Sequence, residues 1–372
     1  YKRQAQFTDV LMGGPMGGYF STTGNFPTGT IMNFNPTDDW TNVFMASDKI
    51  IPVLYSNLRE LERVTDDPIT LAIAEVIKVA AMSRVTDTYG PIPYSKVGED
   101  GKLQVPYDSQ EEVYTRFFEE LDHAIGVLTE HRTGAIAATA DYIYGGSAEK
   151  WCRFANSLKL RLAMRIVYAD EAKARQMAES AVKSEVGVMT ANADNAMLTT
   201  FGEKGNPIYT AVNYNSVTAA DHPDGKDCQT GGDTHVAADI ICYMNGYNDP
   251  RRPLYFTTNV RHLVKETAEP TGEKDQNNED IYNESDILIR KGAQYIGVPV
   301  GCELGNKNGG NDNQRVYYSF LAGGYATPQP IMFAAEGWFL RAEAKLRWTD
   351  AGQQSVKELY EKGIEVSIRN QK

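Results

Sequence analysis

Apolar positions recur at three- and four-residue steps over much of the chain, a pattern that predicts helices packed along one face. Asp67-Pro68 opens one such segment, whose predicted inward face is Ile69, Ala72, Ile73, Val76, Ile77 and Ala80. Ser109 and Glu112 form a capping box before a second segment, whose predicted inward face is Val113, Phe117, Leu121, Ala124, Ile125 and Leu128. Between them, Gly90, Pro91 and Pro93 end the first helix, because proline lacks a backbone N–H and restrains the residue before it.

Further helices are predicted on both sides of this pair. A helix from Thr37 is marked by Trp40, Val43, Phe44, Ile50, Val53, Leu54, Leu58 and Leu61. Ser147 to Ala169 carries Trp151, Phe154, Leu158, Leu162 and Ile166, and a partner helix from Asp170 is lined by Ala174, Ala178, Ala181 and Val182. Two later stripes are Met332, Ala335, Phe339, Ala342 and Leu346, then Val356, Leu359, Tyr360 and Ile364. Alternating large and small faces are typical of tetratricopeptide units, where alanines let helices approach closely.

The stretch between these helical zones has a different composition. Residues 187–330 hold 16 of the 32 glycines and 10 of the 21 tyrosines, and most of this stretch is predicted to be turns. Ile287–Ile289 and Val316–Phe320 are candidate strands. We therefore predict a mainly α fold of tetratricopeptide-like helix pairs, an α/α superhelix, with a large irregular loop-rich insertion containing short strands. The predicted parts are a loop-rich lead-in at 1–36, a helical scaffold at 37–186, the insertion at 187–330 and a C-terminal helical pair at 331–372.

Composition and motifs exclude several classes of function. A net charge of −12 without a Lys/Arg-rich block argues against a nucleic-acid partner, and no apolar run of about eighteen residues could span a bilayer. The acidic pairs Asp38-Asp39 and Asp66-Asp67 stand where helix caps belong, and no nucleophile elbow or phosphate-binding loop is present. We predict neither an enzyme nor a cofactor.

Histidines and cysteines give little support for a metal centre. His235 and Asp239 are four residues apart, and Asp221-His222 precedes Asp224 and Asp227, but polar loops produce such spacings by chance, so no metal site is predicted. Neither Asp275–Asp286 nor Asn306–Asn313 has the spacing of a calcium-binding EF-hand loop. Cys152 is predicted to be a small buried hydrophobe. A disulfide among Cys228, Cys242 and Cys302 stays open, and would leave one of the three unpaired.

Four segments resemble the SusD/RagB family, the surface glycan-binding lipoproteins of Bacteroidetes-type bacteria. They are Asp87–Tyr94, Tyr107–Tyr114, Trp151–Ile166 and Glu336–Arg347. The resemblance implies a right-handed stack of helix pairs, an oligosaccharide ligand and a SusC-like TonB-dependent transporter as partner. It also implies a location at the cell surface of the outer membrane, through a lipid anchor. Because Tyr1 is not a start methionine and the last predicted helix reaches Lys372 without a capping signal, we expect the anchor and signal peptide to lie outside this chain.

Carbohydrate binding also fits the residue types of the loops. An aromatic ring covers the C–H face of a sugar, and amide side chains bond to its hydroxyl rim. The resemblance implies a cleft where the loops before the first long helix meet the insertion. We therefore expect glycan contacts from Tyr19, Phe26, Asn33, Phe34, Tyr209, Tyr214, Tyr247, Asn248 and Tyr325. Three alternatives stay open: these aromatics pack a small core, the helical repeats bind a protein or peptide partner, or the helical fold carries a glycoside hydrolase.

Overall fold

The structure is a computed structural model that describes most of the helical zones and parts of the loops. The described residues are 13–22, 50–98, 105–199, 206, 208, 216–217, 228–229, 234–258, 260–264, 269–274, 280, 287–291, 294–299, 319, 321–322, 326–348 and 353–370. The chain divides into two units, each built from two stretches of sequence. One comprises Tyr1–Val43 and Phe201–Thr327, and the other comprises Phe44–Thr200 and Pro328–Lys372.

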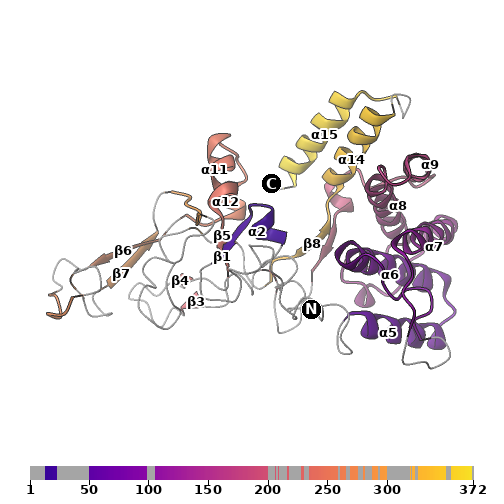
Figure 1. Ribbon diagram of the computed structural model, residues 1–372, viewed down its shortest axis with the longest axis horizontal. Helices are drawn as coiled ribbons and strands as arrows, with labels where there is room; N and C mark the ends of the chain where they lie inside the picture. Colours follow the sequence, from indigo (N-terminus) through magenta and orange to yellow (C-terminus); the bar gives the residue numbers. More distant parts are fainter. Residues whose placement is uncertain are drawn as a thin grey trace. The chain divides into compact units, whose positions relative to one another are not determined.

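The first unit contains short strands and short helices. Its strands form antiparallel pairs: β1 (Phe20–Thr22) with β5 (Thr234–Val236), β3 (Ser216–Val217) with β4 (Cys228–Gln229), and β6 (Val260–Val264) with β7 (Ile287–Lys291) (Figure 1). The helices in its described residues are α2 (Gly14–Met16), α11 (Ala238–Gly246) and α12 (Arg252–Tyr255). The predicted strand at Ile287–Ile289 is thus present as part of β7, whereas Val316–Phe320 lies outside the described residues except for Ser319.

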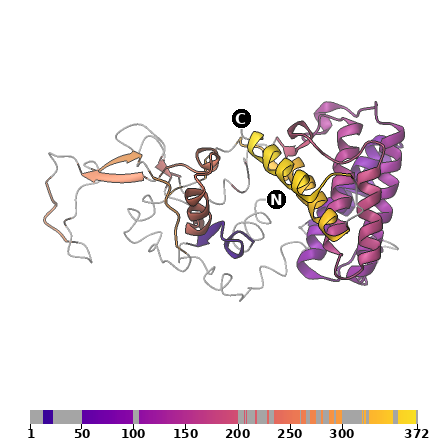
Figure 2. The ribbon, with the colours of Figure 1, turned by 90° about the horizontal axis from the view of Figure 1, so that it is seen from above.

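The lead-in and the insertion meet in the β1–β5 pair. Ser21 lies opposite His235 in this pair, and α11 begins soon after β5 ends. The carbonyl oxygens of Gly18 and Tyr19 accept bonds from the backbone N–H groups of Ile240 and Ala237. Figure 2 accordingly shows α2 and β1 beside α11. A small core stands under this junction, made of Val236, Ile241, Met244 and Phe256.

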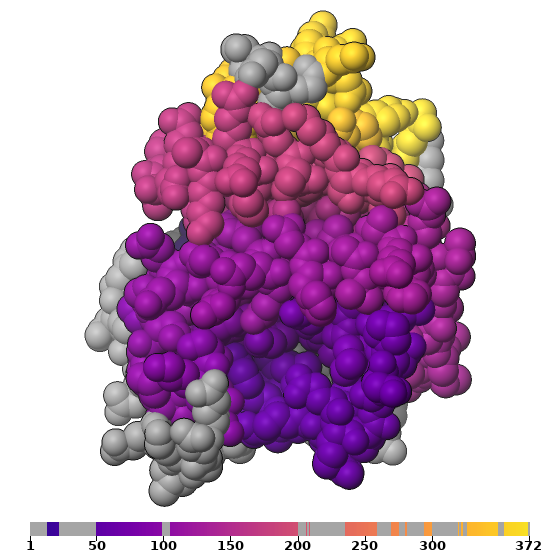
Figure 3. All heavy atoms as spheres, turned by 90° about the vertical axis from the view of Figure 1, so that its right-hand side faces the viewer, coloured from indigo at the N-terminus to yellow at the C-terminus, as the bar shows by residue number. Residues whose placement is uncertain are grey.

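The second unit consists of packed helices. They are α5 (Ile50–Val64), α6 (Pro68–Tyr89), α7 (Gln110–Glu130), α8 (Ala148–Arg165), α9 (Glu171–Lys183), α14 (Ala334–Arg347) and α15 (Val356–Arg369), with short η3 (Ala138–Ala140) and η4 (Asn192–Asp194). The helices pair as α6 with α7, α8 with α9 and α14 with α15, while α7 packs on α8 and α8 on α14. The unit is stacked in chain order, from indigo residues at one end to yellow residues at the other (Figure 3). This arrangement confirms the predicted mainly α, tetratricopeptide-like fold.

The predicted helix starts carry the expected caps. The Asp67 carboxylate accepts the Thr70 N–H at 2.8 Å, and Ser109 with Glu112 forms the reciprocal capping box of α7. The start of α14 is different, because its own N-cap residue is Phe333 and makes no side-chain bond. The amide oxygen of Asn195 accepts the Ala334 N–H instead, at 2.7 Å, so this cap comes from far away in the sequence.

Several predicted core positions are exposed, and the burial of their neighbours explains why. Ile77 is 40% exposed because α6 buries the residues two and five positions further on, Val79 and Met82. Val53, Leu346, Tyr360 and Ile364 are also exposed. Helix α15 packs on α14 through Leu359, Gly363 and Val366, so its buried stripe is rotated from the predicted one. Met332, the first residue of a predicted helical stripe, lies in a strand.

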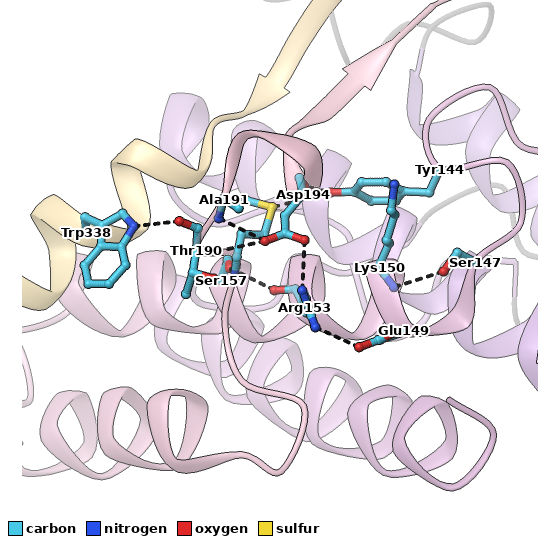
Figure 4. Close-up of polar contacts among 11 residues, drawn as sticks. Tyr144, Ser147, Glu149, Lys150, Arg153, Ser157, Thr190, Ala191, Asp194 and Trp338 are labelled. Carbon is cyan, nitrogen blue, oxygen red and sulfur yellow. Dashed lines mark hydrogen bonds and ion pairs between the residues drawn. The ribbon is translucent and has the colours of Figure 1, made fainter. Parts of the chain in front are cut away.

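A two-stranded clasp closes the second unit where the insertion leaves and returns. Strand β2 (Ala196–Leu198) pairs antiparallel with β8 (Gln329–Met332). Just before β2, Asp194 is bonded to Arg153 of α8, while the Trp338 indole of α14 donates to the Thr190 carbonyl at 3.0 Å (Figure 4). These bonds join α8, the turn at η4 and α14.

Candidate functional site

The end of α11 has a backbone geometry that a single asparagine makes accessible. The N–H of Asn248 bonds to the Asn245 carbonyl at 3.1 Å, and the N–H of Asp249 bonds to the Met244 carbonyl at 2.8 Å. This is the bond pattern of a Schellman motif, which requires a left-handed residue after the helix. Asn248 supplies it with φ +50°, a conformation that asparagine tolerates better than most residues. The motif stops the helix and fixes the backbone around Tyr247.

Two tyrosines are exposed on one face at this helix end. Tyr243 is 68% exposed and Tyr247 is 83% exposed. Residues four apart on a helix lie one above the other, so both side chains emerge from the same side of α11. Large exposed aromatic side chains gain from covering an apolar surface, since their own faces are otherwise in contact with water.

Amide and guanidinium groups lie beside these tyrosines. Arg252 of α12 donates from Nη1 to the Asn245 Oδ1 at 2.8 Å and from Nη2 to the Asn248 Oδ1. The Asn245 Nδ2 donates to the Tyr295 carbonyl at 3.2 Å, and the Arg252 guanidinium stands over the Tyr295 ring at 5.5 Å. Because the Asn248 oxygen accepts from Arg252, its Nδ2 faces elsewhere and has no partner among the residues that the structure describes. We call Tyr243, Asn245, Tyr247, Asn248 and Arg252 the helix-end platform.

The platform rests on a rigid base. The Asp249 carboxylate makes a bidentate pair with Arg251, with Nη2–Oδ2 at 2.6 Å and Nε–Oδ1 at 2.9 Å. These bonds hold the pKa of the Asp249 carboxyl below its usual value, so the pair stays ionised at neutral pH. Below, Met244 and Phe256 belong to the buried core of this unit. A surface held in this way is largely preformed, which lowers the entropy cost of binding.

The chemistry of the platform suits an uncharged polyol with apolar faces. Tyr243 and Tyr247 offer the aromatic planes, and the free Nδ2 of Asn248 offers a donor beside them. No group of three or more His, Cys, Asp or Glu residues that could hold a metal occurs in the described part of the chain. His235 and Asp239 in particular fall in different elements, β5 and α11, and His235 is buried while Asp239 is exposed.

The structure describes three of the nine residues predicted to contact glycan. Tyr247 and Asn248 lie on the platform, whereas Tyr19 is 57% exposed and lies beside the first turn of α11. A nine-residue helix is about 13 Å long, so Tyr19 stands at the opposite end of α11 from Tyr247. The other six, Phe26, Asn33, Phe34, Tyr209, Tyr214 and Tyr325, lie outside the described residues.

Sequence reasoning missed Tyr243, Asn245 and Arg252. The signal for them is the apolar set Ile240, Ile241 and Met244, which marks a short helix within a stretch whose composition predicts turns. Once that helix is recognised, the spacing of Tyr243 and Tyr247 places both tyrosines on one face.

Two other predictions concern the cysteines and the membrane. Cys152 is buried and free, as predicted, and Cys242 of α11 is a free and exposed thiol. The side chain of Cys228 and all of Cys302 lie outside the described residues, so the question of a bond between those two stays open. Among the described helices, none is both long and apolar enough to cross a bilayer.

Comparison with known proteins gives a consistent family. The family model of SusD-like proteins, described as SusD and RagB outer-membrane lipoproteins, matches residues 1–372. A solved SusD homologue from Bacteroides uniformis is 45% identical with a TM-score of 0.79, and the match covers 99% of this chain and 67% of that one. A SusD homologue from Bacteroides thetaiotaomicron is 32% identical with a TM-score of 0.74, covering 100% of this chain and 66% of that one.

A third similar structure has a title that names its ligand. It is a chitin-binding SusD homologue from Flavobacterium johnsoniae, 28% identical with a TM-score of 0.72, covering 100% of this chain and 67% of that one. This chain thus spans about two thirds of the length of these solved structures. A search of curated protein sequences found no match.

Proposed function

We propose that this chain, which belongs to the SusD-like family of SusD and RagB outer-membrane lipoproteins, captures oligosaccharide on the helix-end platform. Membership confirms the resemblance read from the sequence motifs and the outer-membrane location that it implied. The similarity of this chain to a chitin-binding SusD homologue supports a glycan ligand. The observation that carries the proposal is the pair of exposed tyrosines, Tyr243 and Tyr247, one helical turn apart beside polar side chains fixed by Arg252.

The proposed role is capture and delivery without chemistry. The platform binds the glycan, and a SusC-like TonB-dependent transporter receives it. Such a role needs only affinities of about micromolar to millimolar, because tighter binding slows release. The rest of the predicted site, and the division of the chain at residues 36, 186 and 330 with the insertion as its ligand-binding part, belong to this proposal.

Isothermal titration tests the platform directly. We expect heat of binding with one or more members of a panel of neutral oligosaccharides that includes chitin fragments. Removing one stacking ring by Tyr247→Ala should weaken that binding about five-fold or more, since an aromatic contact is worth about 1 kcal/mol. Tyr243→Ala should act in the same direction.

The matched control is Tyr107→Ala, which removes another exposed tyrosine, one that belongs to the helical unit. It should leave the glycan affinity unchanged. A glycan that binds equally well to Tyr243→Ala, Tyr247→Ala and the parent chain would exclude the platform as the site. A chain that gives no heat with any member of the panel would exclude glycan capture by this part of the protein.

A further inference from the structure

The helical unit contains a pocket that the proposed glycan site does not use. It has a volume of about 110 Å³ and lies where α8, α9 and α14 meet the segment that leads into α15. Its apolar wall includes Leu160, Val182, Trp348 and Leu359. The small side chains of Ala178 and Ala344 also line it, and their size leaves space that larger side chains would fill.

Arg341 stands at this pocket with an unusual set of partners. Its guanidinium lies over the Trp338 ring at 4.3 Å, and its Nη2 donates to the Gln354 Oε1 at 2.8 Å. Neither partner carries a charge. Among the described residues, no carboxylate lies within ion-pair distance of Arg341. Burial lowers the pKa of this guanidinium below its usual value, because water stabilises the charged form less at a partly buried site.

Other partly buried arginines of the same unit have such a counter-ion. Arg161 makes a bidentate pair with Glu336, at 2.5 and 2.6 Å, and Arg153 pairs with Asp194 at 3.0 Å. The carboxylate that lines the pocket, Glu179, is already bonded to Arg175 at 2.8 Å and to Lys183 at 2.7 Å. These two bonds hold the pKa of Glu179 below its usual value. Glu179 is thus paired with Arg175 and Lys183 and not with Arg341.

The guanidinium is also held in one plane. Stacking on the Trp338 ring and the bond to Gln354 fix its orientation, and a planar guanidinium matches the two oxygens of a carboxylate. An anion entering the pocket would meet a positive charge that is partly shielded from water, so its attraction would be screened less than at an exposed site.

We propose that this pocket binds an aliphatic carboxylate, with the carboxylate on Arg341 and the aliphatic part against Leu160, Val182 and Trp348. The volume sets the size of the apolar part. A dry cavity of about 150 Å³ admits benzene, so one of this size takes a branched chain of about four or five carbons. The same chemistry occurs in a free short-chain acid and in the last residue of a polypeptide that ends in leucine or valine.

Titration calorimetry on the full chain tests the carboxylate requirement without any mutation. The probes are 4-methylpentanoate, a free acid, and N-acetyl-leucine, which mimics a polypeptide end. Their control is 4-methylpentanamide, which has the shape of the acid without its charge. We expect one or both acids to bind at least ten-fold more tightly than the amide, and more weakly in 0.5 M NaCl. Preference between the two acids identifies the source of the ligand.

Two variants locate the site. Arg341→Gln keeps a side chain that can bond to Gln354 but removes the charge, and it should weaken acid binding about ten-fold or more. Val182→Phe fills the apolar part and should abolish binding. Arg116→Gln removes an exposed arginine of α7 and should change nothing. Equal affinity for acid and amide, unchanged binding by Arg341→Gln, or no acid binding at tens of millimolar would each overturn the proposal, and the first and last comparisons need no variant to fold.

Discussion

The Arg153 guanidinium lies 3.0 Å from the Asp194 carboxylate, and the Asp194 side chain is only 5% exposed. The second carboxylate oxygen accepts the backbone N–H groups of Thr190 and Ala191, both at 3.0 Å. The Asp194 carbonyl oxygen accepts the Tyr144 hydroxyl at 2.8 Å. Asp194, a single residue of a short turn, therefore accepts hydrogen bonds from a side chain of α8, from backbone N–H groups of its own turn and from a tyrosine before α8 (Figure 4).

Replacing Asp194 should destabilise the helical unit strongly. Asp194→Ala removes the acceptor of the Arg153 Nη1 and of two backbone N–H groups, so we expect a loss of about 2–4 kcal/mol in the free energy of unfolding. Urea unfolding followed by circular dichroism measures it. Glu149→Gln is the matched control, because Glu149 pairs with the same arginine at an exposed position, and it should cost less than about 0.5 kcal/mol. Equal losses in the two variants would contradict this role of Asp194.

The cap of α6 gives a prediction with a pH dependence. Asp67→Ala should cost about 1 kcal/mol, because it removes the acceptor of the Thr70 N–H. The bonds from Thr70 lower the pKa of the Asp67 carboxyl below its usual 3.8. The stability that the ionised Asp67 carboxylate contributes is therefore complete above pH 3.8. It is lost as the pH falls through the lowered pKa that this carboxyl has in the folded protein.

The difference between parent and Asp67→Ala should thus shrink in acid, measured by urea unfolding at pH 7 and near pH 3. Asp66→Ala changes the exposed neighbouring acid and should stay within about 0.5 kcal/mol of the parent. A difference that grows in acid would be the wrong sign for a capping carboxylate.

The buried hydroxyl of Tyr94 gives a prediction for the stability of the protein at alkaline pH. It donates to Glu120, which also accepts from Lys78 at 2.8 Å. Tyr94→Phe should cost about 1–2 kcal/mol at neutral pH, because Glu120 loses a bond inside the protein. Burial, reinforced by Glu120, raises the pKa of Tyr94 well above its usual 10.0.

The ionisable hydroxyl therefore contributes stability below pH 10 that is lost as the pH rises further, since only the unfolded chain ionises easily there. The stability difference between the parent and Tyr94→Phe should narrow between pH 10 and 11. Tyr107→Phe, at a 60% exposed position, should show neither effect. A pH-independent difference would mean that the hydroxyl does not stay protonated in the folded state.

Two helical glycines should respond to alanine with opposite signs. A Cβ on Gly126 of α7 meets nothing within 4 Å, so Gly126→Ala should stabilise by about 0.5–1 kcal/mol through helix propensity. A Cβ on Gly363 of α15 would stand 2.7 Å from the Phe339 ring, so Gly363→Ala should destabilise by about 1–3 kcal/mol. Thermal unfolding of the two variants measures both, and a gain in both would show that α14 and α15 pack less closely than the structure has them.

The helical half of the fold could be predicted from sequence because its signals are local. Capping residues such as Asp67 and Ser109 specify helix starts by bonds three residues away, and a capping box is readable in the letters themselves. The faces that depend on a distant partner were harder to predict. Ile77 and Tyr360 fit a regular apolar stripe in the sequence, yet both are exposed in the structure. Which face of α6 or α15 is buried depends on where the neighbouring helices pack.

The candidate site was predicted only in part for a related reason. Tyr247 and Asn248 stand out as an aromatic and an amide in a loop, but Arg252 joins the platform through a turn that only the left-handed Asn248 creates. The cap that Asn195 gives to Ala334 is equally unreadable, since 139 residues separate the two.

The β2–β8 clasp has a consequence for how such a protein can change over evolutionary time. Met197 pairs with Pro330, so the two ends of the long segment between these residues lie side by side where they join the helical unit. Lengthening, shortening or exchanging that segment leaves the clasp and the helices behind it intact, and extra length adds little closure entropy. Under the proposed function, ligand specificity can therefore change through this insertion while the helical scaffold stays nearly the same.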